Sequence, residues 1–229
     1  MKTICMDDVK NCIYNPKMMG TADLYNCSID DEEYVFKKFD FDSTLACKLE
    51  KLSKIENHHF IFPEILIKGI RGQYVGYLSK PFYQSRTFFD LSKYETSQKL
   101  KLLREARKLV LKMHSMGITH VDLHPGNMLF RDDTVKFCDF DDCEYSGFKS
   151  PHSNAYSQKY LLQNPMSPSI DIFNFNISSM SILYSVRWDE TINYDFTFLD
   201  KLNDEQKIIW EKVKKYETLS KDDFIVSHY

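Results

Sequence analysis

The sequence THVDLHPGNMLFRDDTVKFCDFD, residues 119–141, decides the fold of this chain. Two runs of β-prone residues, 128–131 and 134–138, flank the turn-forming pair Asp132-Asp133. Strand-forming runs separated by such residues are typical of a β-hairpin. The stretch therefore predicts a loop, a short hairpin and a second loop.

Three polar residues flank this predicted hairpin. Asp122 and Asn127 precede its first strand, and Asp139 follows its second strand. A hairpin returns the chain to the edge where it began, so we expect the three side chains at one edge. Two carboxylates and an amide suit a divalent metal that prefers oxygen ligands, and they leave one carboxylate to orient a nucleophile.

The spacing H-x-D-L-x-x-x-N followed by D-F-x resembles the catalytic and metal-binding loops of the protein-kinase-like superfamily. The residues that carry it are His120, Asp122, Leu123, Asn127, Asp139 and Phe140. The competing interpretation is a surface loop with turn-forming Asp and Asn. The resemblance implies an α+β, two-lobed kinase-like fold, with a small β-rich N-lobe and a short, mainly helical C-lobe.

The resemblance also implies roles for these residues. Asp122 would orient an acceptor hydroxyl and accept its proton, and Asn127 and His120 belong to the same catalytic loop. Asn127 and Asp139 would hold Mg²⁺ against the phosphates of ATP. On this basis we expect an ATP-dependent phosphotransferase.

The stretch EYVFKKF, residues 33–39, has the alternation of a strand, with Val35 and Lys37 on one face. A kinase-like fold needs a strand lysine that holds the α and β phosphates. The pattern V-x-K selects Lys37, with Lys38 as the alternative. A solvated strand lysine is the ordinary interpretation of either residue.

Residues 42–55 are predicted to form a helix with Asp42 or Ser43 as N-cap. Its apolar face consists of Leu45, Leu49 and Leu52. In the resemblance, a glutamate on this helix pairs with the strand lysine, which selects Glu50. A solvent-exposed glutamate is the alternative.

Residues 18–39 indicate a strand, a turn and a strand. Residues 20–25, GTADLY, stand where a kinase-like fold carries its phosphate-covering loop. Backbone N–H groups can cradle phosphate only where side chains are small. The expected glycines are reduced to Gly20 and Ala22, so a plain hairpin turn remains an alternative.

We expect one kinase-like domain over residues 1–229, divided into an N-lobe (1–80), a hinge (81–86) and a C-lobe (87–229). Residues 60–67 and 73–78 supply two further strands of a five-stranded N-lobe sheet.

The C-lobe is expected to contain helices at 97–116, 169–185 and 204–216. Asp171 lies near the start of the second of these helices. By resemblance it would brace the catalytic-loop backbone, and it would equally suit the helix macrodipole. Residues 142–168 occupy the place of an activation or substrate-binding segment.

The composition narrows the class of protein. The chain has 229 residues, 43% hydrophobic and 28% charged, with a formal net charge of −3. This gives no case for a nucleic-acid partner. No run of apolar residues is long enough for a membrane span or a signal peptide. Six cysteines without a C-x-x-C pair indicate reduced thiols and a cytoplasmic protein.

Three residues depart from the protein-kinase pattern. His124 replaces a lysine, and the sequence His-Pro-Gly-Asn is closer to aminoglycoside and choline kinases. Asp141 replaces the glycine of D-F-G. Val121 replaces an arginine, which argues against a switch by activation-loop phosphorylation. The predicted helix at 169–185 resembles that of protein kinases, so the acceptor is expected to be a protein Ser/Thr hydroxyl. His124 favours a small-molecule kinase as the alternative, and a catalytically weak pseudokinase scaffold is a third possibility.

Overall fold

The structure is a computed structural model that describes residues 1–14, 23–150, 154–193 and 201–229. The chain divides into two compact units. Unit 1 comprises Met1–Gln84 and Asp139–Asp141, and unit 2 comprises Ser85–Cys138 and Asp142–Tyr229. Each unit is described by itself below. Strands and helices together make an α+β protein, which confirms the α+β part of the predicted fold class.

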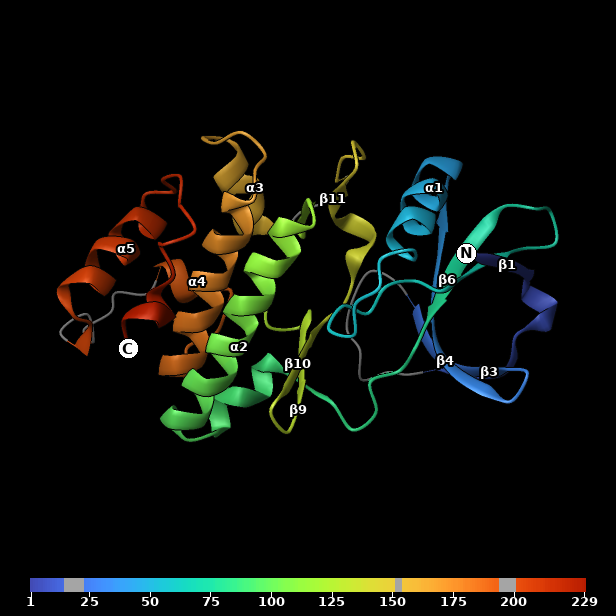
Figure 1. Cartoon of the computed structure of the whole chain (residues 1–229), viewed down its shortest axis with the longest axis horizontal. Coiled ribbons are helices and arrows are strands. Elements are labelled where there is room, and N and C mark those ends of the chain that lie inside the picture. Colours follow the sequence, from blue (N-terminus) through green and yellow to red (C-terminus); the bar gives the residue numbers. More distant parts are fainter. Residues whose placement is uncertain (15–22, 151–153, 194–200) are drawn as a thin grey trace. The chain divides into compact units, whose positions relative to one another are not determined.

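Unit 1 is built on a mixed sheet, which has six strands among the described residues (Figure 1). Its strand order is β1-β5-β6-β4-β3-β2. The strands are β1 (Lys2–Cys5), β2 (Lys10–Tyr14), β3 (Asp23–Ile29), β4 (Glu32–Phe41), β5 (Ile65–Lys68) and β6 (Tyr74–Ser79). β1 pairs in parallel with β5, and the other pairs are antiparallel.

The prediction of five strands was wrong: the sequence located only four of them, β3 to β6, and neither β1 nor β2 was recognised. Both are edge strands, and none of their residues is buried. Edge strands of this kind lack the alternation of buried and exposed residues that sequence patterns detect.

The turn between β3 and β4 lies at Asp30 and Asp31, where both residues have positive φ. Two-residue hairpin turns require this backbone conformation, and Asp tolerates it. Asp23 and the two residues after it lie within β3, so this part of the predicted phosphate-covering loop is strand. Gly20 and Ala22 lie outside the described residues.

Helix α1 (Ser43–Leu52) begins where the sequence predicts. The side chain of Asp42 accepts a hydrogen bond from the backbone N–H of Leu45 at 2.9 Å, as an N-cap should. The core of the sheet consists of Cys27, Ile29, Tyr34, Phe36, Ile65, Ile67 and Leu78.

Unit 2 contains the predicted hairpin, with β9 (Met128–Arg131) paired to β10 (Thr134–Phe137). β7 (Arg86–Thr87) extends this sheet beside β9. A separate two-stranded ladder joins β8 (Ile118–Thr119) to β11 (Glu144–Tyr145).

The main helices of unit 2 are α2 (Thr96–Ser115), α3 (Ala155–Leu161), α4 (Ser169–Tyr184) and α5 (Asp204–Lys214). Short 3₁₀ turns occur at Met6–Asp8, Phe88–Lys93, Phe140–Asp142, Thr191–Asn193 and Ile225–His228. Helices α2, α4 and α5 confirm the three predicted helices. Helix α3 was missed because its seven residues form a short polar segment.

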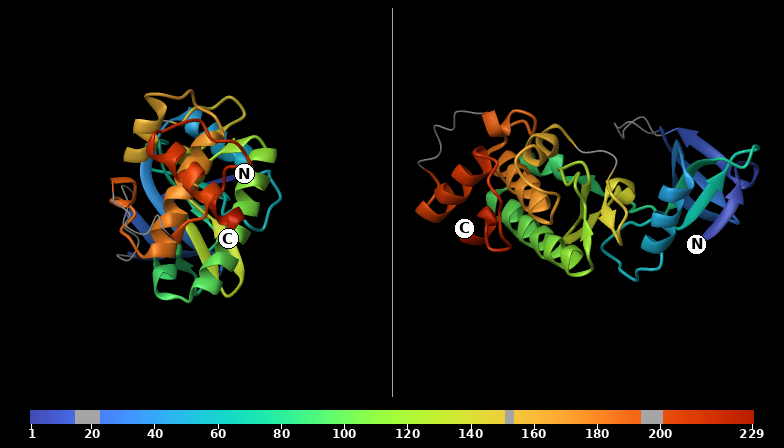
Figure 2. Two further views of the ribbon diagram at one scale, coloured as in Figure 1. Left: turned by 90° about the vertical axis from the view of Figure 1, so that its left-hand side faces the viewer. Right: turned by 90° about the horizontal axis from the view of Figure 1, so that it is seen from above.

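Helix α4 is the central element of unit 2. It packs against α2, α3 and α5, and Figure 2 shows the same arrangement from two other sides. Every residue at 169–182 is buried, so the helix is enclosed rather than amphipathic. The polar side chains that it carries must therefore find partners inside the protein.

Helix hydropathy gives no sign of a membrane span: across the described ranges, none of the helices combines the length and the apolar character needed.

Candidate active site

The backbone at the start of the predicted catalytic loop is held by one buried carboxylate. Asp171, near the start of α4, accepts hydrogen bonds from the backbone N–H groups of His120 and Val121, both at 2.8 Å. The ring of His114 adds a third contact at 3.0 Å. Val121 has φ 69°, which is unfavourable for a β-branched residue. Asp171 thus stabilises a strained loop and is more than a helix-start charge.

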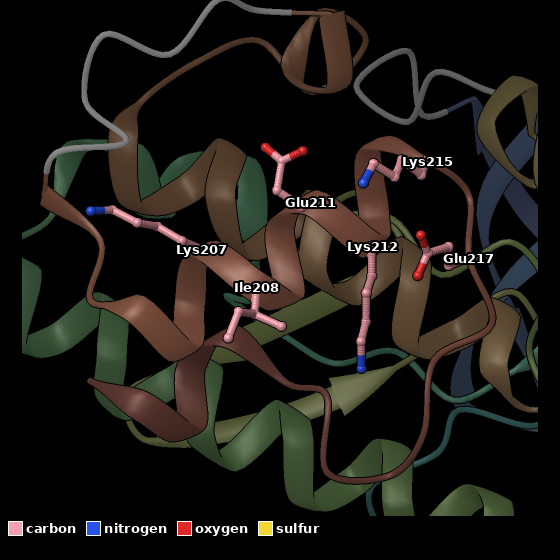
Figure 3. A pocket seen from close by; sticks show the side chains of 6 residues that line it. All are labelled: Lys207, Ile208, Glu211, Lys212, Lys215 and Glu217. Carbon is pink, nitrogen blue, oxygen red and sulfur yellow. The ribbon is translucent and has the colours of Figure 1, made fainter.

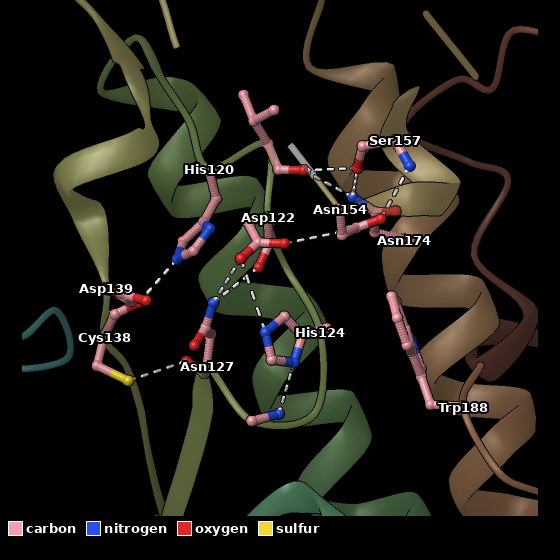
Figure 4. Close-up of polar contacts among 12 residues, drawn as sticks. His120, Asp122, His124, Asn127, Cys138, Asp139, Asn154, Ser157, Asn174 and Trp188 are labelled. Carbon is pink, nitrogen blue, oxygen red and sulfur yellow. Dashed lines mark hydrogen bonds and ion pairs between the residues drawn. The ribbon is translucent and has the colours of Figure 1, made fainter. Parts of the chain in front are cut away.

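Asp122 presents its carboxylate from this loop with both oxygens held by amides (Figure 4). Asn154 donates to Oδ1 at 2.9 Å, and Asn127 donates to Oδ2 at 3.3 Å. Asn127 also donates to the main-chain oxygen of Asp122 at 2.9 Å. The Asp122 side chain is 24% exposed. It is therefore fixed in orientation and still accessible to a hydroxyl.

Sequence reasoning missed three residues that support this loop. The main-chain oxygen of Val121 accepts hydrogen bonds from Ser157 at 2.8 Å and Asn174 at 2.9 Å. Asn154 caps α3 as well as holding Asp122. Asn174 was detectable in principle, because it lies about one turn after Asp171 and therefore on the same side of the predicted helix.

His120 is fully buried, and its ring Nε2 lies 2.8 Å from the main-chain oxygen of Cys138. The backbone N–H of Cys138 in turn donates to the oxygen of Asn127 at 3.0 Å. His120 therefore joins the two loops that flank the hairpin. Its predicted part in catalysis stays a prediction.

His124 lies beside Asp122, with its Nε2 3.7 Å from Oδ2. Its Nδ1 accepts a hydrogen bond from the backbone N–H of Gly126 at 3.0 Å, which requires an unprotonated Nδ1. Burial lowers the pKa of His124, and nearby His120 lowers it further, whereas Asp122 opposes the shift. The ring is thus expected to be neutral near pH 7.

In unit 1, Lys37 on β4 is surrounded by carboxylates. Its Nζ donates to Asp139 and to both oxygens of Asp141, the latter at 2.9 Å each. Burial lowers the pKa of Lys37, but the two carboxylates outweigh this effect and raise it overall. Lys38, the alternative, is exposed on the opposite face of the strand. The structure brings Lys37, not Lys38, to the D-F-x stretch.

The predicted ion pair between Lys37 and Glu50 is wrong. Glu50 is 48% exposed and pairs at 3.5 Å with Lys54, which lies four residues later, just past the end of α1. The buried face of α1 consists of Ala46, Lys48, Leu49 and Leu52, and Glu50 lies off that face. Lys48 takes the inward position and donates to the main-chain oxygen of Asp141.

The donor chemistry of the predicted metal ligands fits Mg²⁺. Within the described part of the chain, no group of three or more His, Cys, Asp or Glu residues could hold a metal by itself. Mg²⁺ is usually held by one or two carboxylates together with substrate phosphates, so a complete protein cage is not required. Asp139 supplies a carboxylate, and Asn127 turns its nitrogen to Asp122, which leaves its Oδ1 as the acceptor end.

A hollow on the surface of α5 contains none of these residues (Figure 3). It is lined by Lys207, Ile208, Glu211, Lys212, Lys215 and Glu217. Lys212 is turned to Asp223 at 2.7 Å. The alternating charges are those of a solvated helix face.

Comparison with known proteins gives one informative relative. No family model matches the chain. A protein of Acanthamoeba polyphaga mimivirus, described as a "putative serine/threonine-protein kinase", is 26% identical over 125 residues. The match covers 51% of this chain and 23% of that protein, so the chain spans less than a quarter of its relative. The similarity supports a kinase-like relationship for this sequence.

Proposed function

We propose that this chain is a kinase-type phosphotransferase with a two-lobed kinase-like fold, which moves the γ-phosphoryl group of ATP to a hydroxyl acceptor. The observation that carries the proposal is the geometry of Asp122. Its carboxylate is fixed by Asn127 and Asn154 on a loop whose backbone is bonded to Asp171. Phosphoryl transfer needs this kind of rigid positioning more than covalent chemistry.

Asp122 has the role of orienting the acceptor. A free carboxylate oxygen lone pair accepts a hydrogen bond from the acceptor hydroxyl and takes up its proton as the new P–O bond forms. The amides of Asn127 and Asn154 keep the carboxylate in one orientation throughout. The basic Nδ1 of His124 is occupied by the backbone N–H of Gly126, which leaves the carboxylate of Asp122 as the base of the loop.

Lys37 has the role of binding the nucleotide phosphates, and Asp139 and Asn127 would hold Mg²⁺. When bound, Mg²⁺ supplies neutralisation of the phosphate charge. The assignment of Asn127 and Asp139 follows from their positions in the H-x-D-L-x-x-x-N and D-F-x patterns. Lys37 carries its charge throughout the physiological pH range, as a phosphate-binding residue requires.

A protein Ser/Thr hydroxyl is the preferred acceptor, in line with the name of the mimivirus relative. A small-molecule hydroxyl is the second candidate. It is favoured by His124 in the sequence His-Pro-Gly-Asn, which resembles small-molecule kinases.

The test is transfer of radioactive γ-phosphoryl from ATP with Mg²⁺, offered to a generic protein and, separately, to aminoglycosides. We expect label on the protein, reduced roughly 10²- to 10⁴-fold in Asp122→Asn. The matched control is Asp133→Asn in the exposed hairpin turn, where activity should be unchanged. Label on the aminoglycoside would support the second candidate. Absence of both ATP binding and turnover would refute the proposal and favour a scaffold.

A further inference from the structure

Asp141 is the most firmly anchored carboxylate beside Lys37. Both of its oxygens accept from Lys37 Nζ at 2.9 Å, and Oδ1 also accepts from the hydroxyl of Tyr77 at 3.0 Å. Its main-chain oxygen accepts from Lys48. Only 5% of the residue is exposed. A buried carboxylate is costly unless it is paired and hydrogen-bonded in this way.

We propose that Asp141 is the positioning residue for Lys37. It thus has the role that the kinase-like resemblance assigns to a glutamate of α1. The inference rests on the proposed function, because it concerns the lysine assigned to the nucleotide phosphates. Glu50, the only glutamate in α1, lies on the exposed face and pairs with Lys54.

The charges of the side chains around Lys37 support this proposal. Lys37 and Lys48 bring two positive charges, and Asp139 and Asp141 bring two negative charges. In the kinase-like pattern, α1 would supply the anion and the third residue of D-F-x would be a neutral glycine. Here α1 supplies a cation and the third residue supplies the anion, so the two positions have exchanged charge.

The two aspartates of the D-F-x stretch differ in their exposure and in their contacts with Lys37. The side chain of Asp139 is 36% exposed and contacts Lys37 through one oxygen, whereas the side chain of Asp141 is 8% exposed and contacts it through both. Asp139 thus retains an accessible oxygen for another ligand. Asp141 makes the more buried and more extensive contact with Lys37.

Phe140 fixes both aspartates in this arrangement. It is fully buried, and its ring packs on Phe60 and Phe62 with centroids 5.6 and 4.7 Å apart. With the residue between them anchored in the core of unit 1, the carboxylates on either side are directed to the same lysine. This geometry argues for a fixed loop rather than a mobile one.

The first experiment measures the reactivity of Lys37 and needs no enzymatic activity. Pulse acylation with an amine-reactive ester, read by mass spectrometry, reports how accessible the amine is to the reagent. We expect Lys37 to be labelled several-fold faster in Asp141→Asn than in the wild type, relative to Lys38 in the same molecule. Glu50→Gln is the matched control and should leave the rate unchanged. An unchanged rate in Asp141→Asn would overturn the inference.

The second experiment measures ATP kinetics in the same variants. We expect KM for ATP to rise about tenfold in Asp141→Asn, with a smaller fall in kcat, because the change weakens phosphate binding rather than acceptor orientation. Asp141→Glu should recover part of the loss. An unchanged KM in Asp141→Asn, or an equal rise in Glu50→Gln, would overturn the inference.

A charge exchange tests the proposal by rescue. In Asp141→Gly, the added change Lys48→Glu returns the carboxylate to α1, and we expect it to lower KM for ATP again. In the wild-type background, Lys48→Glu alone should raise KM. Failure of rescue together with unchanged Lys37 labelling would overturn the inference. If the wild type neither binds nor consumes ATP, the proposed function fails, and the labelling experiment still decides whether Asp141 positions Lys37.

Discussion

Two carboxylate networks in this protein are stabilised in opposite ways. In unit 2, Asp122 and Asp171 are held mainly by amides and backbone N–H groups. In unit 1, Asp139 and Asp141 are held mainly by the ammonium group of Lys37. The first network depends on hydrogen-bond geometry and the second on charge balance. Substitutions in unit 2 should therefore act through lost donors, and substitutions in unit 1 through uncompensated charge.

The largest effect is expected for Asp171→Ala. Two buried backbone N–H groups would lose their acceptor, and each such loss costs about 1–3 kcal/mol. We expect the free energy of unfolding to fall by roughly 3–5 kcal/mol, measured by urea denaturation. The control is Asp222→Ala on the exposed surface, which should change it by less than about 0.5 kcal/mol. A loss below about 1 kcal/mol in Asp171→Ala would show that water replaces the carboxylate.

A smaller effect is expected when Asp122 loses one amide. Asn154→Ser keeps a good N-cap for α3 but removes the Nδ2 donor to Asp122. We expect the rate of phosphoryl transfer to fall about tenfold, equivalent to about 1.4 kcal/mol, at nearly unchanged stability. Asn154→Ala should show the same loss of rate and also destabilise the protein by about 1 kcal/mol. Equal rates in Asn154→Ser and wild type would mean that Asn127 alone orients the carboxylate.

A third prediction concerns the effect of pH on the neutral ring of His124 in unit 2. The pKa of His124 is lowered by burial, so below its unfolded value of about 6.5 the unfolded chain binds more protons. The stability that the neutral ring contributes is therefore lost as the pH falls from about 6.5 to the lowered pKa of the folded state, and it does not change further below that. We expect unfolding free energies at pH 5.5 and 7.0 to differ less in His124→Gln than in wild type. His58→Gln, at an exposed position, is the control, and an equal pH dependence in all three proteins would contradict the assignment.

The comparison also explains which parts were predictable from sequence. The hairpin, α2, α4 and α5 follow from periodicity and turn residues, which are local signals. Asp122, Asn127 and Lys37 were selected by motif, and the structure places the first two together and Lys37 beside Asp139. The prediction for Glu50 was wrong because a motif gives a position along the chain and not the face of the helix. The burial of Leu49 and Leu52 determines which face of α1 is turned inward.

The remaining features depend on tertiary contacts. Asn154 and Ser157 come from a polar segment whose helix is defined by packing against α4. The sequence shows that Asp141 departs from the kinase pattern. It does not show the partner of Asp141, because Lys37 is 104 residues away in sequence. Such a contact has no local signal, and only the structure reveals that Asp141 and Lys48 have exchanged charges relative to the expected pattern.

The smallest effect is expected at Glu50, whose exposed ion pair contrasts with the buried pair of Lys37 and Asp141. Glu50 and Lys54 form an exposed pair at the end of α1, and such a pair contributes about 0.3–0.5 kcal/mol and is screened by salt. A double-mutant cycle with Glu50→Gln and Lys54→Gln should give a coupling energy of that size at low salt and nearly zero at 1 M NaCl. Lys37 labelling should be unchanged in both single variants. A salt-resistant coupling above about 1 kcal/mol would place Glu50 in a buried ion pair, and would return the anchoring role to α1.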